Sequence, residues 1–177
     1  GLHHFRYHRL RLFGDAVVVF QNCTFVVRKA LENQQCIVTA QGRKERHQPS
    51  GIVIQGSSIV TNHTEKFDNK VYLARPWKNH SRTIFMDTYI GDLIQPEGYM
   101  PWQGPTGLSG MDSCFYADYN NTGPGSNKSK RVKWRGIMTL NLESVSHYLP
   151  YKFFHGDDWI KVTRIPYSSA VTAPNKH

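Results

Sequence analysis

The stretch Ala16-Val17-Val18-Val19-Phe20 is the first of six short apolar runs that decide the fold. The others are Cys36-Ile37-Val38-Thr39-Ala40, Gly51-Ile52-Val53-Ile54, Ser58-Ile59-Val60, Val71-Tyr72-Leu73 and Thr83-Ile84-Phe85-Met86. Each run is rich in β-branched residues and bounded by polar turns, which is the pattern of a β-strand. Helical periodicity is absent over most of residues 15–100. The spacing of the runs is typical of a solenoid whose coils each contribute two or three strands.

The pattern changes after Trp102. Residues 120–126 have the Asn, Gly and Pro content of a loop, and residues 143–154 are expected to contain a short helix. Residues 156–160 are interpreted as a turn into a final apolar segment. No linker composition separates these parts, so the sequence predicts one all-β domain with loops and a short helix near its C-terminus.

Composition and charge narrow the classes of function. The 177 residues are 39% hydrophobic, and 22 Lys and Arg against 13 Asp and Glu give a net charge of +9. A basic chain favours anionic partners such as nucleic acid or acidic polysaccharide. The positive residues are dispersed and lack the interleaved aromatic residues of a base-stacking module, so we expect no nucleic-acid partner. No apolar run is long enough to span a bilayer, so no membrane partner is expected either.

Cysteines and sequons say little about the compartment. Cys23, Cys36 and Cys114 have no zinc-type spacing, and they allow either one disulfide with a free thiol or three thiols. The N-terminal histidines have no Asp, Glu or Cys beside them, and no metal or other cofactor is predicted. Five Asn-x-Ser/Thr sites favour an extracellular glycoprotein, and they begin at Asn22, Asn62, Asn79, Asn120 and Asn127. Asn22 lies within a strand pattern and is the least suitable acceptor.

The segment Tyr72-Leu73-Ala74-Arg75-Pro76-Trp77-Lys78 is the best candidate for a binding site. Arg75 can hold a carboxylate with its planar, permanently charged guanidinium group. Trp77 can offer a flat apolar face to a sugar ring or an ester. Pro76 restricts both its own backbone and that of Arg75, which fixes the relation between the two side chains.

Several further motifs join Arg75 in one family pattern. In chain order they are Phe13-Gly14-Asp15-Ala16, Val19-Phe20-Gln21-Asn22-Cys23, Val38-Thr39-Ala40-Gln41-Gly42-Arg43, Gly51-Ile52-Val53-Ile54-Gln55, Leu73-Ala74-Arg75-Pro76-Trp77-Lys78, Ser81-Arg82-Thr83, Tyr116-Ala117-Asp118-Tyr119-Asn120-Asn121-Thr122-Gly123-Pro124-Gly125 and Arg131-Val132-Lys133-Trp134. With these motifs in this order, the chain resembles the C-terminal part of a plant pectin methylesterase from about Phe13 to its end.

The resemblance implies a right-handed parallel β-helix and hydrolysis of galacturonate methyl esters in pectin. It also implies a secreted monomeric enzyme of the cell wall, with no metal and with a proteinaceous inhibitor as a possible partner. In this family an aspartate attacks the ester, a second aspartate acts as acid and base, and glutamines stabilise the oxyanion. Carried over, Arg75 is the catalytic arginine that orients the nucleophile. Trp77 stacks on substrate, and Trp102 is a further aromatic residue of the cleft.

The family pattern fails at the nucleophile. The family motif Asp-Phe-Ile-Phe-Gly corresponds to residues 10–14, which places Leu10 where the attacking aspartate should be. Asp15 belongs to the next segment and does not replace it. We therefore expect residues 1–12 to be a foreign or aberrant segment and residues 13–177 a partial β-helix domain, incomplete at its N-terminal end. Similarly, Ser57 occupies the position of the cysteine that pairs with Cys23 in some plant members, so no disulfide is expected there.

Three other hypotheses compete with an incomplete esterase. The first is a non-catalytic protein that binds acidic cell-wall polysaccharide through its net charge and Trp77. The second is a basic protein that binds nucleic acid, but this sequence contains no motif for nucleic-acid recognition. The third is a β-helix polysaccharide lyase, which needs a calcium-binding carboxylate cluster, whereas the sequence offers only Asp87 and Asp92.

Overall fold

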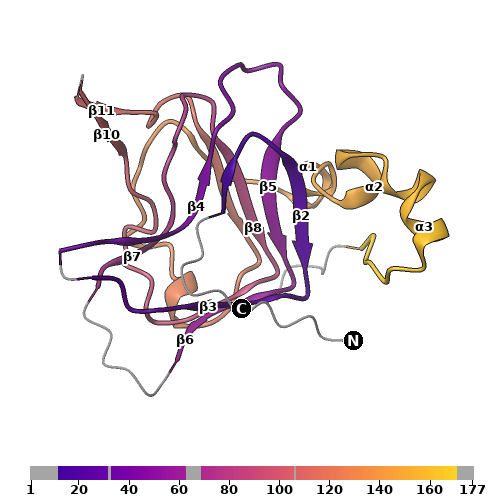
Figure 1. Cartoon of the computed structure of the whole chain (residues 1–177), viewed down its shortest axis with the longest axis horizontal. Helices are drawn as coiled ribbons and strands as arrows, with labels where there is room; N and C mark the ends of the chain where they lie inside the picture. The colour runs from indigo at the N-terminus through magenta and orange to yellow at the C-terminus, as the bar shows by residue number, and fades with distance from the viewer. Residues whose placement is uncertain (1–11, 32, 63–68, 106, 171–177) are drawn as a thin grey trace.

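Three parallel sheets, each built from strands of successive coils, form the body of the chain in the computed structural model, which describes residues 12–31, 33–62, 69–105 and 107–170 (Figure 1). The first sheet contains β1 (Leu12–Gly14), β4 (Cys36–Gln41) and β7 (Val71–Ala74). The second contains β13 (Ile137–Met138), β12 (Phe115–Tyr119), β8 (Arg82–Met86), β5 (Gly51–Gln55) and β2 (Val17–Gln21). The third contains β3 (Thr24–Val27), β6 (Ser58–Thr61) and β9 (Tyr89–Ile90).

Successive strands in sequence move from one sheet to the next, and each coil then returns to the first sheet one layer further along. In the second sheet, Val19 of β2 pairs with Val53 of β5, which pairs with Ile84 of β8, which pairs with Ala117 of β12. All these pairings are parallel, so each turn of the chain is one coil of a solenoid. The predicted right-handed parallel β-helix is confirmed.

The apolar runs are continuous because both faces of the second sheet are covered. Ile52 and Ile54 point into the coil and belong to the inner core with Phe85. Val53 and Ile84 point outward, yet neither is exposed to solvent, because they pack with residues of the C-terminal segment. A strand that is buried on both faces has no need of polar residues at alternate positions.

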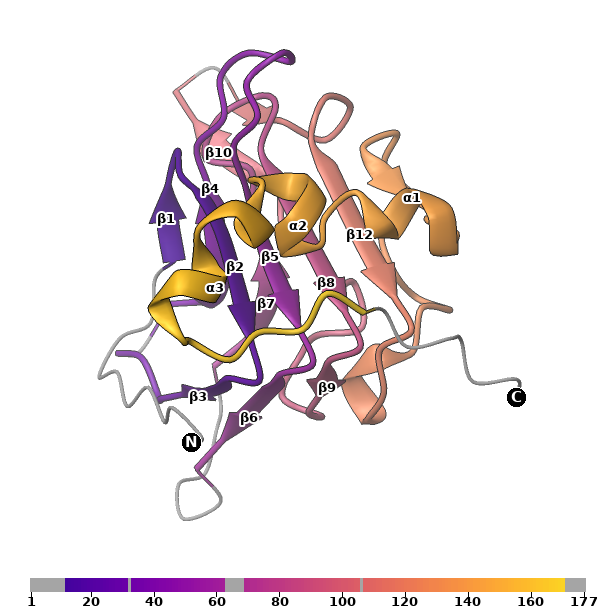
Figure 2. The same ribbon diagram turned by 90° about the vertical axis from the view of Figure 1, so that its right-hand side faces the viewer.

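Short helices cover this outer face (Figure 2). They are α1 (Leu142–Ser146), α2 (Pro150–Phe153) and α3 (Ile160–Thr163), with a 3-10 turn, η2 (Gly156–Asp158), between α2 and α3. A second 3-10 turn, η1 (Pro124–Ser126), lies beside β9 of the third sheet. The helix expected within residues 143–154 is therefore present, as α1 and α2. Val145 and Leu149 bring the apolar side of this segment onto the sheet. The segment 156–160 differs from the expected simple turn, because η2 leads into α3. No helix among the described residues has the length and apolarity needed to cross a membrane.

A stack of left-handed residues turns the chain from the second sheet into the third. It consists of Asn22, Gly56, Asp87 and Asn120, with φ values of 53°, 57°, 51° and 48°. Asn120 Nδ2 donates to Asp87 Oδ1 at 2.6 Å. Asn, Asp and Gly are the residues that adopt this conformation most readily. Asn22 is exposed at this turn, so the expectation that it lies within a strand is wrong.

The residue after each left-handed position links one coil to the next. The backbone N–H of Cys23 donates to Ser57 Oγ at 3.1 Å, and that of Ser57 donates to Thr88 Oγ1 at 3.4 Å. The backbone N–H of Thr88 donates to Asn121 Oδ1 at 3.0 Å. The side chains of Ser57, Thr88 and Asn121 thus form a polar ladder along the solenoid. Ser57 faces Cys23 across neighbouring coils, and no disulfide is present among the described cysteines.

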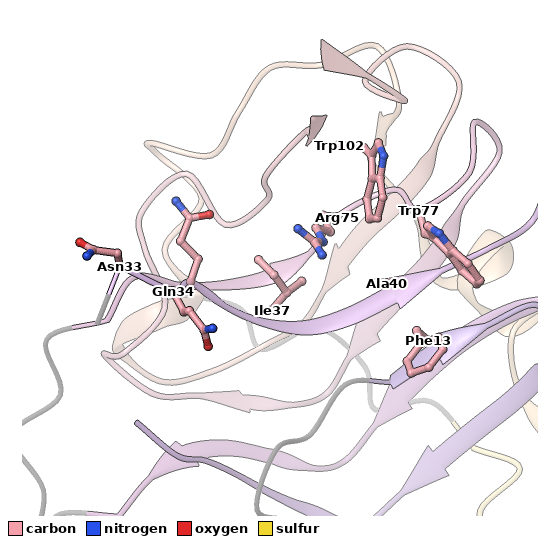
Figure 3. A pocket seen from close by; sticks show the side chains of 9 residues that line it. Phe13, Asn33, Gln34, Ile37, Ala40, Arg75, Trp77 and Trp102 are labelled. Carbon is pink, nitrogen blue, oxygen red and sulfur yellow. The ribbon is translucent and has the colours of Figure 1, made fainter. Parts of the chain in front are cut away.

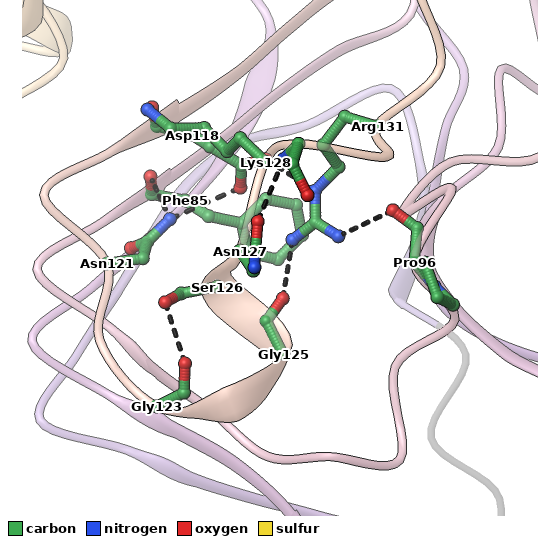
Figure 4. A network of polar contacts seen from close by, with 11 residues as sticks. Phe85, Pro96, Asp118, Asn121, Gly123, Gly125, Ser126, Asn127, Lys128 and Arg131 are labelled. Atoms are coloured by element: carbon green, nitrogen blue, oxygen red, sulfur yellow. Dashed lines mark hydrogen bonds and ion pairs between the residues drawn. The ribbon is translucent and has the colours of Figure 1, made fainter.

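A buried ion pair fixes the last coil (Figure 4). Arg131 Nε lies 3.1 Å from Asp118 Oδ2, and the side chains are only 6% and 7% exposed. The same guanidinium donates to the carbonyl oxygens of Pro96 at 3.2 Å and Gly125 at 2.6 Å. Asp118 also accepts from Asn121 Nδ2 at 3.2 Å. The motif that contains Asp118 and the motif that begins at Arg131 therefore meet in one network, which also reaches the more distant Pro96.

Candidate functional site

A cavity of about 430 Å³ lies on the outer side of the first sheet, and Figure 3 shows the side chains that line it. Its lining comes from β1, β4, the loop before β4, the turn after β7 and the start of a hairpin. The lining residues are Phe13, Asn33, Gln34, Gln35, Ile37, Ala40, Arg75, Trp77 and Trp102. The three residues predicted for the site are therefore brought together in one cavity, which is large enough for sugar units.

Arg75 stands at the end of β7. Its backbone N–H donates to the carbonyl oxygen of Thr39 in the neighbouring coil at 3.1 Å, which fixes the start of the turn. Its Cζ atom lies 4.6 Å from the centre of the Trp102 ring. A guanidinium group over an indole face is a favourable cation–π arrangement. Arg75 is thus a fixed positive charge in the cavity wall, next to a flat aromatic ring.

Trp77 forms a second aromatic wall with Phe13. Their ring centres are 5.8 Å apart, with an angle of 82° between the planes, so the rings meet edge to face. Trp77 is 36% exposed and Phe13 is 66% exposed. Lys78 Nζ lies 5.6 Å from the Trp77 ring centre. Together these residues make an open apolar surface with a cation at its edge, which suits the ring of an anionic sugar.

Trp102 reaches the cavity from a two-stranded antiparallel hairpin, β10 (Trp102–Gly104) and β11 (Gly107–Ser109). Figure 1 shows this hairpin projecting from the body on the side opposite α2. In Figure 3, Trp102 and Arg75 lie between the aromatic pair and the polar side chains of Asn33 and Gln34. The cavity is therefore apolar at one end and amide-rich at the other.

Sequence reasoning missed Phe13 and the three amides Asn33, Gln34 and Gln35. Phe13 pairs with Ala40 across β1 and β4, and both line the cavity. The alternation of a strand, with Leu12 inward, was a signal that could have placed Phe13 outward. The amides follow β3 in a loop, and no periodic pattern marks them. Their carbonyl and NH₂ groups can both accept from and donate to sugar hydroxyls.

Among the described lining residues, none carries a carboxylate. Asp15, which lies close in sequence, is held elsewhere: its carboxylate accepts from Ser50 Oγ, from Gln48 Nε2 at 3.0 Å and from Gln41 Nε2 at 3.3 Å. Leu10, which the resemblance is expected to place at the nucleophile position, lies outside the described residues. So do residues 1–11 of the expected foreign segment, whereas Leu12 pairs with Thr39 in the β-helix.

A calcium site of the lyase type finds no support in the part of the chain that the structure describes. No group of three His, Cys, Asp or Glu residues is gathered there. Asp87 belongs to the left-handed stack and accepts from Asn120. The carboxylates Asp87 and Asp92 therefore do not form part of a cluster of the kind that calcium needs.

Comparison with known proteins agrees with the geometry. The sequence model of the Pectinesterase family matches residues 11–157. A probable pectinesterase/pectinesterase inhibitor 21 of Arabidopsis thaliana is 47% identical over 167 residues, which are 93% of this chain and 24% of the relative. A putative pectinesterase/pectinesterase inhibitor 43 of the same plant is 47% identical over 161 residues, or 89% of this chain and 22% of the relative. The chain thus spans about a quarter of the length of these curated relatives.

Solved structures show the same fold. The pectin methylesterase from carrot superposes with a TM-score of 0.81 and 38% identity, over 88% of this chain and 49% of the carrot chain. The deglycosylated pectin methylesterase from Aspergillus niger gives a TM-score of 0.65 and 26% identity, over 84% of this chain and 44% of that chain. The family model, the plant relatives and the shared β-helix agree, and this chain belongs to the pectinesterase family.

Proposed function

We propose that this chain supplies the substrate-binding wall of a pectin methylesterase, which hydrolyses galacturonate methyl esters to methanol and a carboxylate. The observation that carries the proposal is the joint position of Arg75, Trp77 and Trp102 in one cavity with Phe13. Aromatic rings bind the apolar faces of sugars, and a guanidinium group binds carboxylates in a bidentate manner. Methyl-esterified homogalacturonan presents both kinds of group along one polymer.

The same cavity also supports the alternative function, in which the chain binds pectin and does not cleave it. Ester hydrolysis by the family mechanism needs an aspartate nucleophile, and the described lining residues offer none. Leucine at position 10 has no lone pair with which to attack an ester. Arg75 would then be a catalytic arginine by descent whose remaining role is to hold substrate. A non-catalytic binder of acidic cell-wall polysaccharide is the alternative that this feature favours, together with the net charge of +9.

Other properties follow from the family. The proposed location is the cell wall, after secretion, and the proposed state is a monomer without a metal or organic cofactor. The Arabidopsis relatives carry both pectinesterase and pectinesterase inhibitor in their names. An inhibitor protein is accordingly a proposed partner for the cleft of this chain. We propose residues 1–12 as the aberrant segment, with Leu12 at its end already paired to Thr39 in the β-helix, and residues 13–177 as the family domain.

Replacing Arg75 by alanine should weaken the binding of a methyl-esterified oligogalacturonide by about 10-fold or more. A hydrogen bond to a charged group contributes about 1.5–3 kcal/mol, and the cation–π contact with Trp102 is lost as well. Binding would be measured by isothermal titration calorimetry in 50 mM and 300 mM salt. Arg135→Ala is the matched control, because Arg135 is exposed and does not line the cavity.

Methanol release from methylated pectin separates the two versions of the proposal. The expected result is binding without methanol. Methanol release that Arg75→Ala abolishes would show a complete active site and refute the catalytic deficiency. An equal loss of binding in Arg75→Ala and Arg135→Ala would show that only the net charge acts, and this result, or no loss in Arg75→Ala, would refute the proposed site.

A further inference from the structure

The turn that carries Arg75, Pro76 and Trp77 is held between two glycines that come from different parts of the chain. Gly42 follows β4, and Gly110 follows β11. A Cβ atom on Gly42 would lie 2.8 Å from Cε3 and 3.1 Å from Cζ3 of Trp77. A Cβ atom on Gly110 would lie 2.4 Å from Cγ and 2.6 Å from Cβ of Pro76. Both glycines thus touch the turn where no side chain fits.

At Gly42 the reason for glycine is space alone. Its φ lies outside the left-handed range, so alanine meets no backbone obstacle there. Its backbone N–H donates to the carbonyl oxygen of Gly14 at 2.9 Å, which ties it to the neighbouring coil. The backbone of Gly42 therefore cannot move away from Trp77 without breaking that hydrogen bond. The indole of Trp77 rests directly on this fixed backbone and from there meets Phe13 edge to face.

Gly110 acts at the other side of the turn. It closes the segment that begins with Trp102, and its φ of +84° is one that residues with a side chain rarely adopt. The contacts at the two ends of this segment fall on consecutive residues of the turn, since Trp102 stacks on Arg75 and Gly110 packs on Pro76. A shift of Pro76 would therefore move the Arg75 charge relative to the Trp102 ring.

We propose that Gly42 and Gly110 are positioning residues, which set the placement of Trp77 and Arg75 and hence the width of the pectin-binding cavity. The proposal deepens the proposed function and rests on it for the identity of the ligand. The placement of the rings, however, is a property of the protein alone. It can be measured without any ligand.

The first test reads the position of Trp77 directly. Gly42→Ala should change the near-ultraviolet circular dichroism and the acrylamide quenching of tryptophan fluorescence, because the indole must move away from the added methyl group. The same substitution in a Trp77→Phe background should leave both signals unchanged, since the other tryptophans are not in contact with Gly42. Gly104→Ala is the matched control, because its added Cβ atom would lie 3.5 Å from Trp102 Nε1, an ordinary van der Waals contact that requires no movement of the ring.

The second test reads the consequence for binding. Gly42→Ala should weaken binding of a methyl-esterified oligogalacturonide by about 5- to 20-fold in the wild-type background and by less than 2-fold in a Trp77→Ala background. An equal loss in both backgrounds would show a structural defect and overturn the positioning role, as would wild-type optical signals in Gly42→Ala. If wild type itself does not bind, the proposed function fails, while the optical test still decides the role of Gly42.

Gly110→Ala provides an independent variant. It should weaken binding at least as much as Gly42→Ala, because it displaces the turn and strains the end of the β10–β11 segment together. Circular dichroism in the far ultraviolet would confirm that the β-helix is intact in each variant. If the Gly110→Ala protein is folded and binds with wild-type affinity, Gly110 is not a positioning residue.

Discussion

Replacing Arg131 by alanine should lower the free energy of unfolding by about 3–5 kcal/mol. The substitution leaves the Asp118 carboxylate buried without its guanidinium partner, and that side chain is only 7% exposed. It also removes the donors to the carbonyl oxygens of Pro96 and Gly125. Each buried acceptor left without a partner costs about 1–3 kcal/mol. Urea denaturation followed by circular dichroism measures the change.

Comparing the destabilisation by Asp118→Asn with that by Arg131→Ala tests whether the lost contacts of Arg131 cause the effect. Asp118→Asn keeps the shape of the side chain and an acceptor oxygen, and it leaves the contacts of Arg131 with Pro96 and Gly125 in place. It should therefore destabilise less than Arg131→Ala. The matched control is Lys161→Ala, because Lys161 and Asp157 form an ion pair whose side chains are 66% and 39% exposed. That pair should contribute less than about 1 kcal/mol. Equal effects at Arg131 and Lys161 would contradict the structural role of the buried pair.

The strands of the β-helix were predictable because their residues are buried on both faces. Val53 and Ile84 would be polar if the outer face of the second sheet met solvent, and their apolar character made each run continuous. The helices that cover them were harder to predict. Each is four or five residues long, too short to show a 3.6-residue period. Only the existence of a helix near residues 143–154 followed from the sequence.

The turns between coils were misread for a related reason. Asn22 follows β2 directly and precedes the apolar residues of β3, and a pattern of hydrophobicity alone extends the strand across it. The structure shows that Asn22 begins a stack with Gly56, Asp87 and Asn120, all at positive φ. These are residue types that tolerate this conformation. Such residues recur once per coil in the sequence, but this pattern can be recognised only when the sequences of the coils are aligned with one another.

The site was predictable in part. Arg75 and Trp77 stood in one motif, and Trp102 came from the family resemblance. All three line the cavity. The amides of residues 33–35 and the contacts of Gly42 and Gly110 depend on how distant coils are stacked. Sequence distance hides such contacts, because the residues that meet Trp77 come from β1 and from the end of β4.

Substituting Ser57 by cysteine should create a disulfide with Cys23 and raise the free energy of unfolding by about 4 kcal/mol under oxidising conditions. The two residues face each other in neighbouring coils: Cys23 N donates to Ser57 Oγ at 3.1 Å, and the backbone N–H of Ser58 donates to the Cys23 carbonyl at 2.9 Å. Coils in a parallel sheet lie about 4.8 Å apart, within the Cα separation that a disulfide allows. Closing a loop of roughly 35 residues accounts for the size of the effect.

The redox state provides the control for this last prediction. With dithiothreitol the Ser57→Cys protein should lose the increase in its free energy of unfolding, because the disulfide is reduced. Ser57→Ala should cost about 1–3 kcal/mol in either condition, since it removes the buried hydrogen bonds of Ser57 Oγ with the Cys23 backbone N–H and with the Gln55 carbonyl oxygen. Cys114 should not compete for the new thiol, because burial raises its pKa to about 12 and leaves almost no thiolate at neutral pH. A free-thiol count in denaturant that does not fall by two relative to the reduced form would refute the pairing, and with it the face-to-face register of these two turns.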